Sequence, residues 1–236
     1  MSARGQTIRV DFGRPVPLFP LHVVTLMPHA RLGLHAFEDR YKQLVSEALD
    51  GPGQIAMAVF AGTTWRREYH ANPPLRPAVC VGQIIEHQRL PDGRYNLQLH
   101  GICRARIVEE HPPEEGRPYR TAELEPLGLD MPDETELQPA RTRLERLLTQ
   151  APMTDLRDSA GLLEHIRNED IPTAALIELF SSWFPGEPEL KYRLLSEADA
   201  MRRVRIIEGE FTRLRDLLVR AIPQRQVETP KGCCWN

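Results

Sequence analysis

The sequence predicts an α+β chain, in which a small β-barrel with one helix precedes an α-helical bundle that ends in a long helix. Before about residue 127, apolar residues fall in short, β-branched runs separated by Pro and Gly. After it they recur at helical spacing, and Pro-Asp-Gly at 91–93 marks a β-hairpin. Strands followed by helices are typical of α+β chains or of two domains. We therefore expect domains at 1–127 and 128–224 and a flexible tail at 225–236.

The first part predicts six or seven strands. Residues 16–21 contain two prolines, which a central strand does not tolerate, so we expect an edge strand or an extended opening segment there. Residues 30–37 alternate between apolar and polar and predict a strand, and 38–49 place apolar residues on one face of a short helix. A long loop with proline breakers is expected at 61–77. The remaining strands are expected at 55–60, 78–90, 94–100, 103–109 and 119–124.

The second part predicts three or four helices. The first carries an apolar stripe over 137–148, and a second is expected at 159–167. Pro172 suits the first position of a third, which Pro185-Gly186 ends. Residues 196–199 resemble a capping box before the last helix, which runs to about residue 222. Its apolar residues follow heptad spacing, at Val204, Ile207, Phe211, Leu214, Leu218 and Ala221.

Composition indicates a globular protein, with 41% apolar residues, 27% charged residues and a formal charge of −3. This balance lacks the positive excess that phosphate-backbone binding requires, which argues against nucleic acid as the main partner. No apolar run is long enough to cross a bilayer, and the first ten residues carry no secretory signal, so we expect no membrane partner. Four cysteines without a C-x-x-C pair favour a reducing cytoplasm.

No catalytic signature is found in the sequence. There is no G-x-x-x-x-G-K-[ST] phosphate loop and no serine in G-x-S-x-G. His22, His29 and His35 do not have the spacing that presents metal ligands together. Cys233-Cys234 lacks the upstream basic residues of a prenylation signal, and its role stays open. We therefore expect no enzyme activity, no cofactor and no metal.

Five short segments of the first part resemble the amino-terminal domain of the Lon protease family, and the arginine-rich composition is typical of a bacterial protein. Residues 16–21 (VPLFPL) and 34–41 (LHAFEDRY) match its opening signature, and 81–84 (VGQI), 91–95 (PDGRY) and 101–104 (GICR) match its later strand, hairpin and closing segment. The helical second part extends the resemblance over residues 14–222. Two departures fall in the loop after residue 21, where His22-Val23-Val24 replaces a Pro-Gly turn and His29 replaces a glycine. This loop is expected to differ in shape.

The resemblance implies a PUA-like β-barrel followed by a helical bundle, and a module that recognises substrate proteins. Because the sequence holds neither a Walker motif nor a Ser/Lys peptidase segment, we expect a stand-alone, non-catalytic member. Most motif positions are expected to be structural, with Phe37 and Tyr41 on one helix face and Glu38 and Arg40 pairing with strand ends or cap amides. The motif positions in question are Pro17, Leu18, Phe19, Pro20, Phe37, Glu38, Arg40 and Tyr41.

Three functions compete on the sequence alone. The first is a module that binds unfolded or exposed apolar protein segments, with a protease or chaperone as further partner and self-association left open. The loop at 61–77 carries residue types enriched at binding hot spots, namely Trp65, Arg66, Arg67 and Tyr69; the alternative is an ordinary surface loop with Trp65 folded back onto the barrel. The second function is an RNA-binding PUA-like module. The third is a hydrolase with no identifiable catalytic residues.

Overall fold

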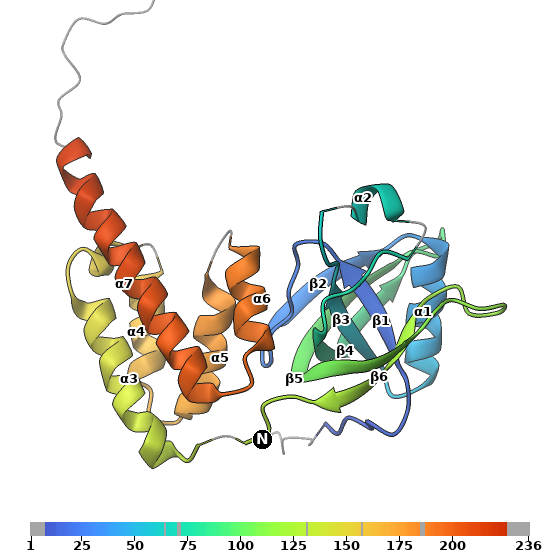
Figure 1. Cartoon of the computed structure of the whole chain (residues 1–236), viewed down its shortest axis with the longest axis horizontal. Helices are drawn as coiled ribbons and strands as arrows, with labels where there is room; N and C mark the ends of the chain where they lie inside the picture. Colours follow the sequence, from blue (N-terminus) through green and yellow to red (C-terminus); the bar gives the residue numbers. More distant parts are fainter. Residues whose placement is uncertain are drawn as a thin grey trace, which may run out of the picture. The chain divides into compact units, whose positions relative to one another are not determined.

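Six strands form one sheet in the computed structural model, which describes residues 8–63, 65–69, 72–130, 132–156, 158–184 and 187–225. The strand order is β2-β5-β4-β3-β1-β6, and β5 also pairs with β6 (Figure 1). The pairings therefore close a circuit through β1, β3, β4, β5 and β6, to which β2 is added alongside β5. The strands are β1 (Val16–Leu21), β2 (Arg31–Ala36), β3 (Gln54–Val59), β4 (Ala78–Arg89), β5 (Tyr95–His111) and β6 (Thr121–Pro126). The predicted α+β class is confirmed.

The position of β1 corrects the prediction of an edge strand at residues 16–21. β1 lies between β3 and β6, parallel to β3 from Leu18 to Leu21 and antiparallel to β6 at Val16 and Pro17. The β6 pairing covers only the start of β1. Pro20 therefore has a neighbouring strand, β3, on one side only. Because no strand faces its other side, the N–H that proline lacks breaks no ladder hydrogen bond there.

A single strand, β5, replaces the two strands predicted at 94–100 and 103–109. It pairs with β4 through the predicted hairpin, where Gly93 has φ 83° and the Arg94 N–H donates to the Asp92 carboxylate. The register shifts twice along the pair, once between Ile84 and Glu86 and once between Val81 and Gly82. At the second shift Val81 lies opposite Cys103 and Gly82 opposite Gly101. This bulge allows β5 to bend, so that one part of it pairs with β2 and another part pairs with β6.

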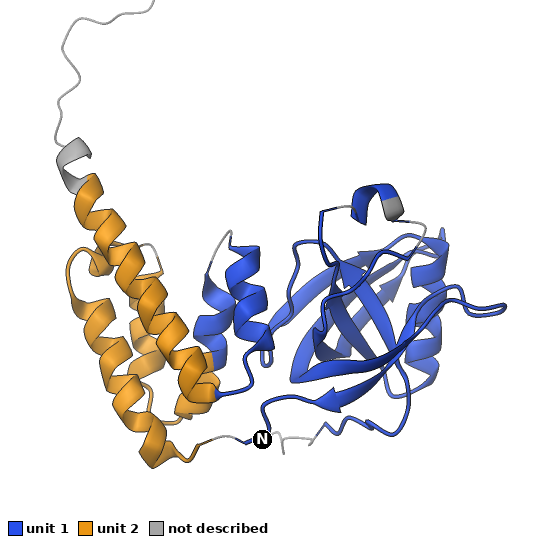
Figure 2. Cartoon of the chain, viewed as in Figure 1, with its two compact units in different colours: residues 1–131, 178–199 blue, residues 132–177, 200–236 orange. Residues whose placement is uncertain are grey.

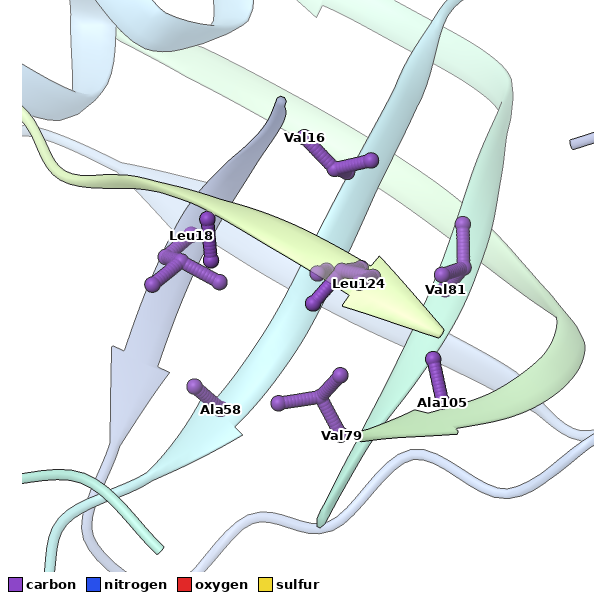
Figure 3. Packing of buried hydrophobic residues seen from close by; sticks show 9 residues of the cluster. Val16, Leu18, Ala58, Val79, Val81, Ala105 and Leu124 are labelled. Carbon is purple, nitrogen blue, oxygen red and sulfur yellow. The ribbon is translucent and has the colours of Figure 1, made fainter. Parts of the chain in front are cut away.

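The core of the β circuit is made of small and β-branched side chains that alternate along the strands. Leu18, Val79, Val81 and Ala105 are fully buried, and Figure 3 shows them facing one another from β1, β4 and β5. Inward-facing residues from neighbouring strands thus fill the circuit with side chains, as expected for a barrel of this size. α1 (Asp39–Asp50) contacts β1, β2 and β3 and buries Tyr41, Leu44, Val45 and Ala48.

The second half of the chain is helical, as predicted, and contains one helix that the sequence did not predict. The helices are α3 (Glu134–Thr149), α4 (Ser159–Arg167), α5 (Thr173–Trp183), α6 (Pro188–Ser196) and α7 (Ala200–Arg225). Ser196 ends α6, so the predicted capping box at 196–199 is wrong. Pro188 at the start of α6 and its buried Leu190 and Leu194 were the available signals. In α7, Val204, Ile207 and Phe211 are fully buried, whereas Leu214, Leu218 and Ala221 are half-buried.

Contacts divide the chain into two compact units that do not follow chain order (Figure 2). The first comprises Met1–Met131 and Glu178–Asp199, and the second comprises Pro132–Ile177 and Ala200–Asn236. The end of α5 and all of α6 therefore group with the strands, although the sequence assigns them to one helical domain over 128–224. Glu178 and Tyr192 contact β5 and β4, and Glu189 pairs with Arg76 just before β4. The predicted tail, with Cys233 and Cys234, lies outside the described residues from 226 onward.

Candidate functional site

The loop predicted at 61–77 is closed at its base and contains a short helix, α2 (Trp65–Glu68). Phe60 pairs with Leu75 as an isolated bridge, and the Ala61 N–H donates to the Pro74 carbonyl at 2.8 Å. The loop therefore leaves β3 and returns beside it before β4 begins. This closure fixes where the four predicted binding residues lie.

Trp65 packs back onto residues that directly follow β1 and β3. Its ring stacks on His22 at 4.3 Å between centroids and lies parallel to Phe60 at 5.7 Å. Tyr69 meets Phe60 and Trp65 edge-on at 6.0 and 6.4 Å. We call His22, Phe60, Trp65 and Tyr69 the aromatic cluster. Trp65 remains half-buried, so part of its ring reaches solvent.

An ion pair anchors the cluster from the other side. The Arg40 guanidinium lies 2.9 Å from the Glu38 carboxylate, with both side chains mostly buried. The Tyr69 hydroxyl donates to the same carboxylate. Arg40 also sits over the rings of Tyr41 and Tyr69, at 4.6 and 4.7 Å, and such cation–π contacts strengthen when water is partly excluded.

The electrostatics of this anchor keep both phenols protonated. Burial raises the pKa of Tyr41 far above its ordinary value. Burial also raises the pKa of Tyr69, and the Glu38 carboxylate beside it adds to the shift. Tyr69 therefore acts as a hydrogen-bond donor that holds the loop to the start of α1, and its polar end is not available to a ligand.

Phe37 departs from its predicted role. α1 begins at Asp39, and Glu38 is an extended residue before it whose side chain makes no capping hydrogen bond. Phe37 therefore precedes the helix, and the spacing of four residues to Tyr41 does not place them on one helix face. Tyr41 is 4% exposed and stacks on Phe19 at 4.3 Å, whereas Phe37 is 60% exposed. The prediction of a shared buried face is wrong for Phe37.

The remaining motif positions lie in or near the core. Leu18 and Phe19 are buried on β1, Pro20 is buried, and Pro17 is half-buried. Glu38 and Arg40 pair with each other and with the aromatic cluster, and not with strand ends. The sequence did not indicate His22 and Phe60 as cluster members; an aromatic residue directly before the proline-rich loop was the only local signal.

Arg66 and Arg67 give the cluster an exposed cationic margin. Both are exposed, and Arg66 lies 5.4 Å from the Trp65 ring centroid. Among the described residues, neither forms an ion pair. Val23, which follows His22, is 53% exposed. The arrangement offers an aromatic surface, an apolar side chain and two free guanidinium groups, which are features of contact surfaces for protein chains.

The described residues offer no grouping of three His, Cys, Asp or Glu side chains that could hold a metal ion. His22 stacks on Trp65, His29 lies 6.4 Å from His100, and His35 bonds to Asn96. Cys80 and Cys103 are free thiols, and burial raises the pKa of Cys103 to about 11. Within the described part of the chain, no helix has the length and apolar character that a membrane span needs.

Two motif glycines have a role that the sequence did not reveal. Gly82 on β4 lies opposite Gly101 on β5, and the turn at 26–30 packs on both. The His29 N–H donates to the Gly101 carbonyl, and the Gly101 N–H donates to Ala30. His29 itself adopts φ 62°, which explains why glycine suits this position. In this chain a histidine adopts that conformation.

Comparisons with known proteins agree on one family. The family model described as "ATP-dependent protease La (LON) substrate-binding domain" matches residues 15–210. The N-terminal domain of the Mycobacterium avium complex Lon protease superposes with a TM-score of 0.65 at 14% identity, over 84% of this chain and 98% of that one. A Lon N-terminal domain protein from Xanthomonas campestris gives 0.56 at 24% identity, over 87% and 98%. No curated protein sequence matches the chain significantly.

Proposed function

Because the chain belongs to the family of Lon (ATP-dependent protease La) substrate-binding domains, we propose that it binds protein segments that expose apolar side chains, as unfolded proteins do. We also propose that it catalyses no reaction itself. The observation that carries the first proposal is the half-buried Trp65, whose ring stacks on His22 and lies close to the Arg66 guanidinium. A fixed aromatic ring loses little conformational entropy when it binds a partner, so it suits a hot spot.

Each of the four predicted binding residues has a distinct part in this proposal. Trp65 supplies apolar contact area, and Arg66 and Arg67 supply exposed cations beside it. Tyr69 positions the loop through its hydrogen bond to Glu38. A polar margin around an apolar centre is the common arrangement of protein-binding surfaces.

Trp65→Ala is expected to weaken binding of a permanently unfolded probe, reduced and carboxymethylated α-lactalbumin, by about thirtyfold, the effect of losing a hot spot of about 2 kcal/mol. Trp65→Phe keeps an aromatic ring and is the matched control, expected to bind within a few-fold of the parent chain. Fluorescence anisotropy of the labelled probe measures both. If Trp65→Ala binds as well as the parent at an unchanged melting temperature, the Trp65 surface is not the contact.

The chain is expected to hydrolyse neither ATP nor casein. No phosphate loop exists in the sequence. Ser159, Ser182 and Ser196 each donate their hydroxyl to a backbone carbonyl of the same or an adjoining turn. These hydroxyls direct their proton to a backbone carbonyl and not to a general base, which a serine nucleophile requires. Hydrolysis above a boiled control that co-elutes with the protein on a sizing column would contradict the expectation.

We place this binding activity in the cytoplasm. Cys80 is buried and Cys103 half-buried, and both are free thiols. Burial raises the pKa of each, which keeps them protonated and unreactive. A chain that retains its thiols in the core suits a reducing compartment.

A further inference from the structure

β2 has one edge without a neighbour. It ends the strand order and pairs only with β5 (Figure 1). The Gly101 N–H donates to the Ala30 carbonyl at 2.9 Å, which sets the alternation along this antiparallel pair. The backbone N–H and C=O groups therefore hydrogen-bond to β5 at Leu32, Leu34 and Ala36. At Arg31, Gly33 and His35 they point away from β5. In the described part of the chain, nothing bonds to these outward groups.

Proteins usually protect such an edge with a proline, a bulge or a lysine. The six residues of β2 contain neither proline nor lysine, and the register with β5 runs without a shift. Three donors and three acceptors are thus presented in one row. This is the pattern that lets an extended peptide join a sheet as an extra strand.

An open hollow lies over the exposed face of β2, β5 and β4, and Gly33 is part of its lining. Outside its two chain neighbours, no heavy atom lies within 4 Å of the position that a Cβ would occupy at Gly33. The open hollow has a volume of ≈ 520 Å³, and its lining includes Gly33, His35, Glu86, Gln88, Asn96 and Gln98. Asn96 fixes the His35 ring at 2.7 Å, and the exposed Phe37 ring stacks on His35 at 6.0 Å. The lining of the hollow is therefore mainly polar, and Phe37 stacks on one of its residues, His35.

The side chains around this edge define what fits it. An aromatic side chain on a neighbouring strand can cover a glycine in an edge strand and so remove exposed backbone from water. Arg31 is exposed, on the same face as Gly33 and two residues before it, and forms no ion pair among the described residues. A carboxylate two residues from the aromatic one would lie beside Arg31 in the added strand.

We propose that the free edge of β2 binds an extended segment of a substrate protein as an added strand, with an aromatic side chain over Gly33 and an acidic side chain beside Arg31. This rests on the proposed function and names the segment that it recognises. It also gives a role to the exposed Phe37, which stacks on His35 and offers the added strand a further aromatic contact.

The first test uses a fluorescein-labelled peptide with a central Phe, Glu two residues on either side and Val or Thr elsewhere. Its Phe→Ala and Glu→Lys forms are expected to bind more weakly, and a form N-methylated at alternate residues is expected not to bind, because it cannot pair with the edge. These comparisons leave the protein unchanged. Equal binding of the parent and N-methylated peptides would overturn the proposal.

The second test changes the protein at one outward amide. Gly33→Pro removes an N–H that takes no part in the β5 ladder, and proline is tolerated at such edge positions. It is expected to weaken peptide binding about tenfold, the effect of one lost hydrogen bond that leaves its partner unsatisfied. Gly33→Ala keeps the amide and is the matched control, expected to stay within about threefold. Equal losses in both variants would contradict the proposal.

Amide hydrogen exchange by NMR separates this proposal from the function on which it rests. On saturation with the peptide, the amides of Arg31, Gly33 and His35 are expected to slow, whereas those of Leu32 and Leu34 are already protected by β5. If unfolded α-lactalbumin binds but the three outward amides stay fast with either probe, strand addition is wrong and the proposed function stands. If neither probe binds the parent chain, both proposals fall.

Discussion

Glu178→Leu is expected to destabilise the protein by about 3–5 kcal/mol, because it leaves a buried guanidinium without its carboxylate. Arg104 on β5 and Glu178 on α5 are 2.6 Å apart and only 5% and 6% exposed. Arg104 also donates to the Leu194 carbonyl of α6, at a longer 3.5 Å. This pair therefore ties the end of α5 and α6 to the strands within one unit.

The double variant Arg104→Met with Glu178→Leu is the control for this prediction. Replacing a buried ion pair by apolar residues of similar volume is often neutral or stabilising. The double variant is therefore expected to recover most of the loss, and urea unfolding of the parent, both single variants and the double variant gives the coupling energy. If Glu178→Leu alone melts like the parent, or if the two single effects simply add, the ion pair does not hold these helices.

Gly101→Ala is expected to destabilise by at least about 3 kcal/mol or to prevent folding, at or above the upper end of the range for overpacked sites. A Cβ at this position would lie 2.0 Å from the Met27 carbonyl oxygen and 3.2 Å from Pro28 Cα. Both are backbone atoms, so a rotamer change cannot relieve the clash. The turn at 26–30 would have to leave β5 and lose its two hydrogen bonds to Gly101.

Two other glycines provide a comparison for this prediction, because a new Cβ at each meets less obstruction. At Gly82, the nearest atom to a new Cβ is the flexible end of Leu26 at 2.8 Å, so Gly82→Ala is expected to cost less, about 1–3 kcal/mol. Gly33 has open space, and Gly33→Ala is expected to change the free energy of unfolding by no more than about 0.5 kcal/mol. Thermal and urea unfolding of the three variants measures the order. A Gly101→Ala protein as stable as Gly33→Ala would refute the close approach.

Local patterns in the sequence account for the strands and helices that were predicted well. The Pro-Asp-Gly turn, the buried run at β3 and the stripes of α3 and α7 depend on neighbours a few residues away. The prediction failed where distant segments decide. β1 carries two prolines yet lies between two strands, because β6 pairs with its first residues only. α6 is short, and its buried face is completed by β4.

For the candidate site too, the sequence indicated the residues, whereas their arrangement depended on the fold. Trp65, Arg66, Arg67 and Tyr69 were found from residue type and their place in a loop, and Glu38, Arg40 and Tyr41 from the family motif. Their arrangement required the fold, since the Tyr69 hydroxyl meets a carboxylate 31 positions earlier in the chain. Phe37 was misplaced because the spacing rule for helices was applied to a residue that lies two positions before the helix begins.

By itself, the sequence determined the α+β class, the hairpin, the family and the residue types of the loop at 61–77, since periodicity, turn chemistry and motifs depend on residues that are close together in the chain. Only the tertiary structure decided that Gly82 and Gly101 receive a turn, that Arg104 meets Glu178, and that β2 keeps a free edge. Each of these depends on which segments the sheet brings together. A residue's partner across a sheet is set by strand order and register, and neither can be inferred from a short stretch of neighbouring residues.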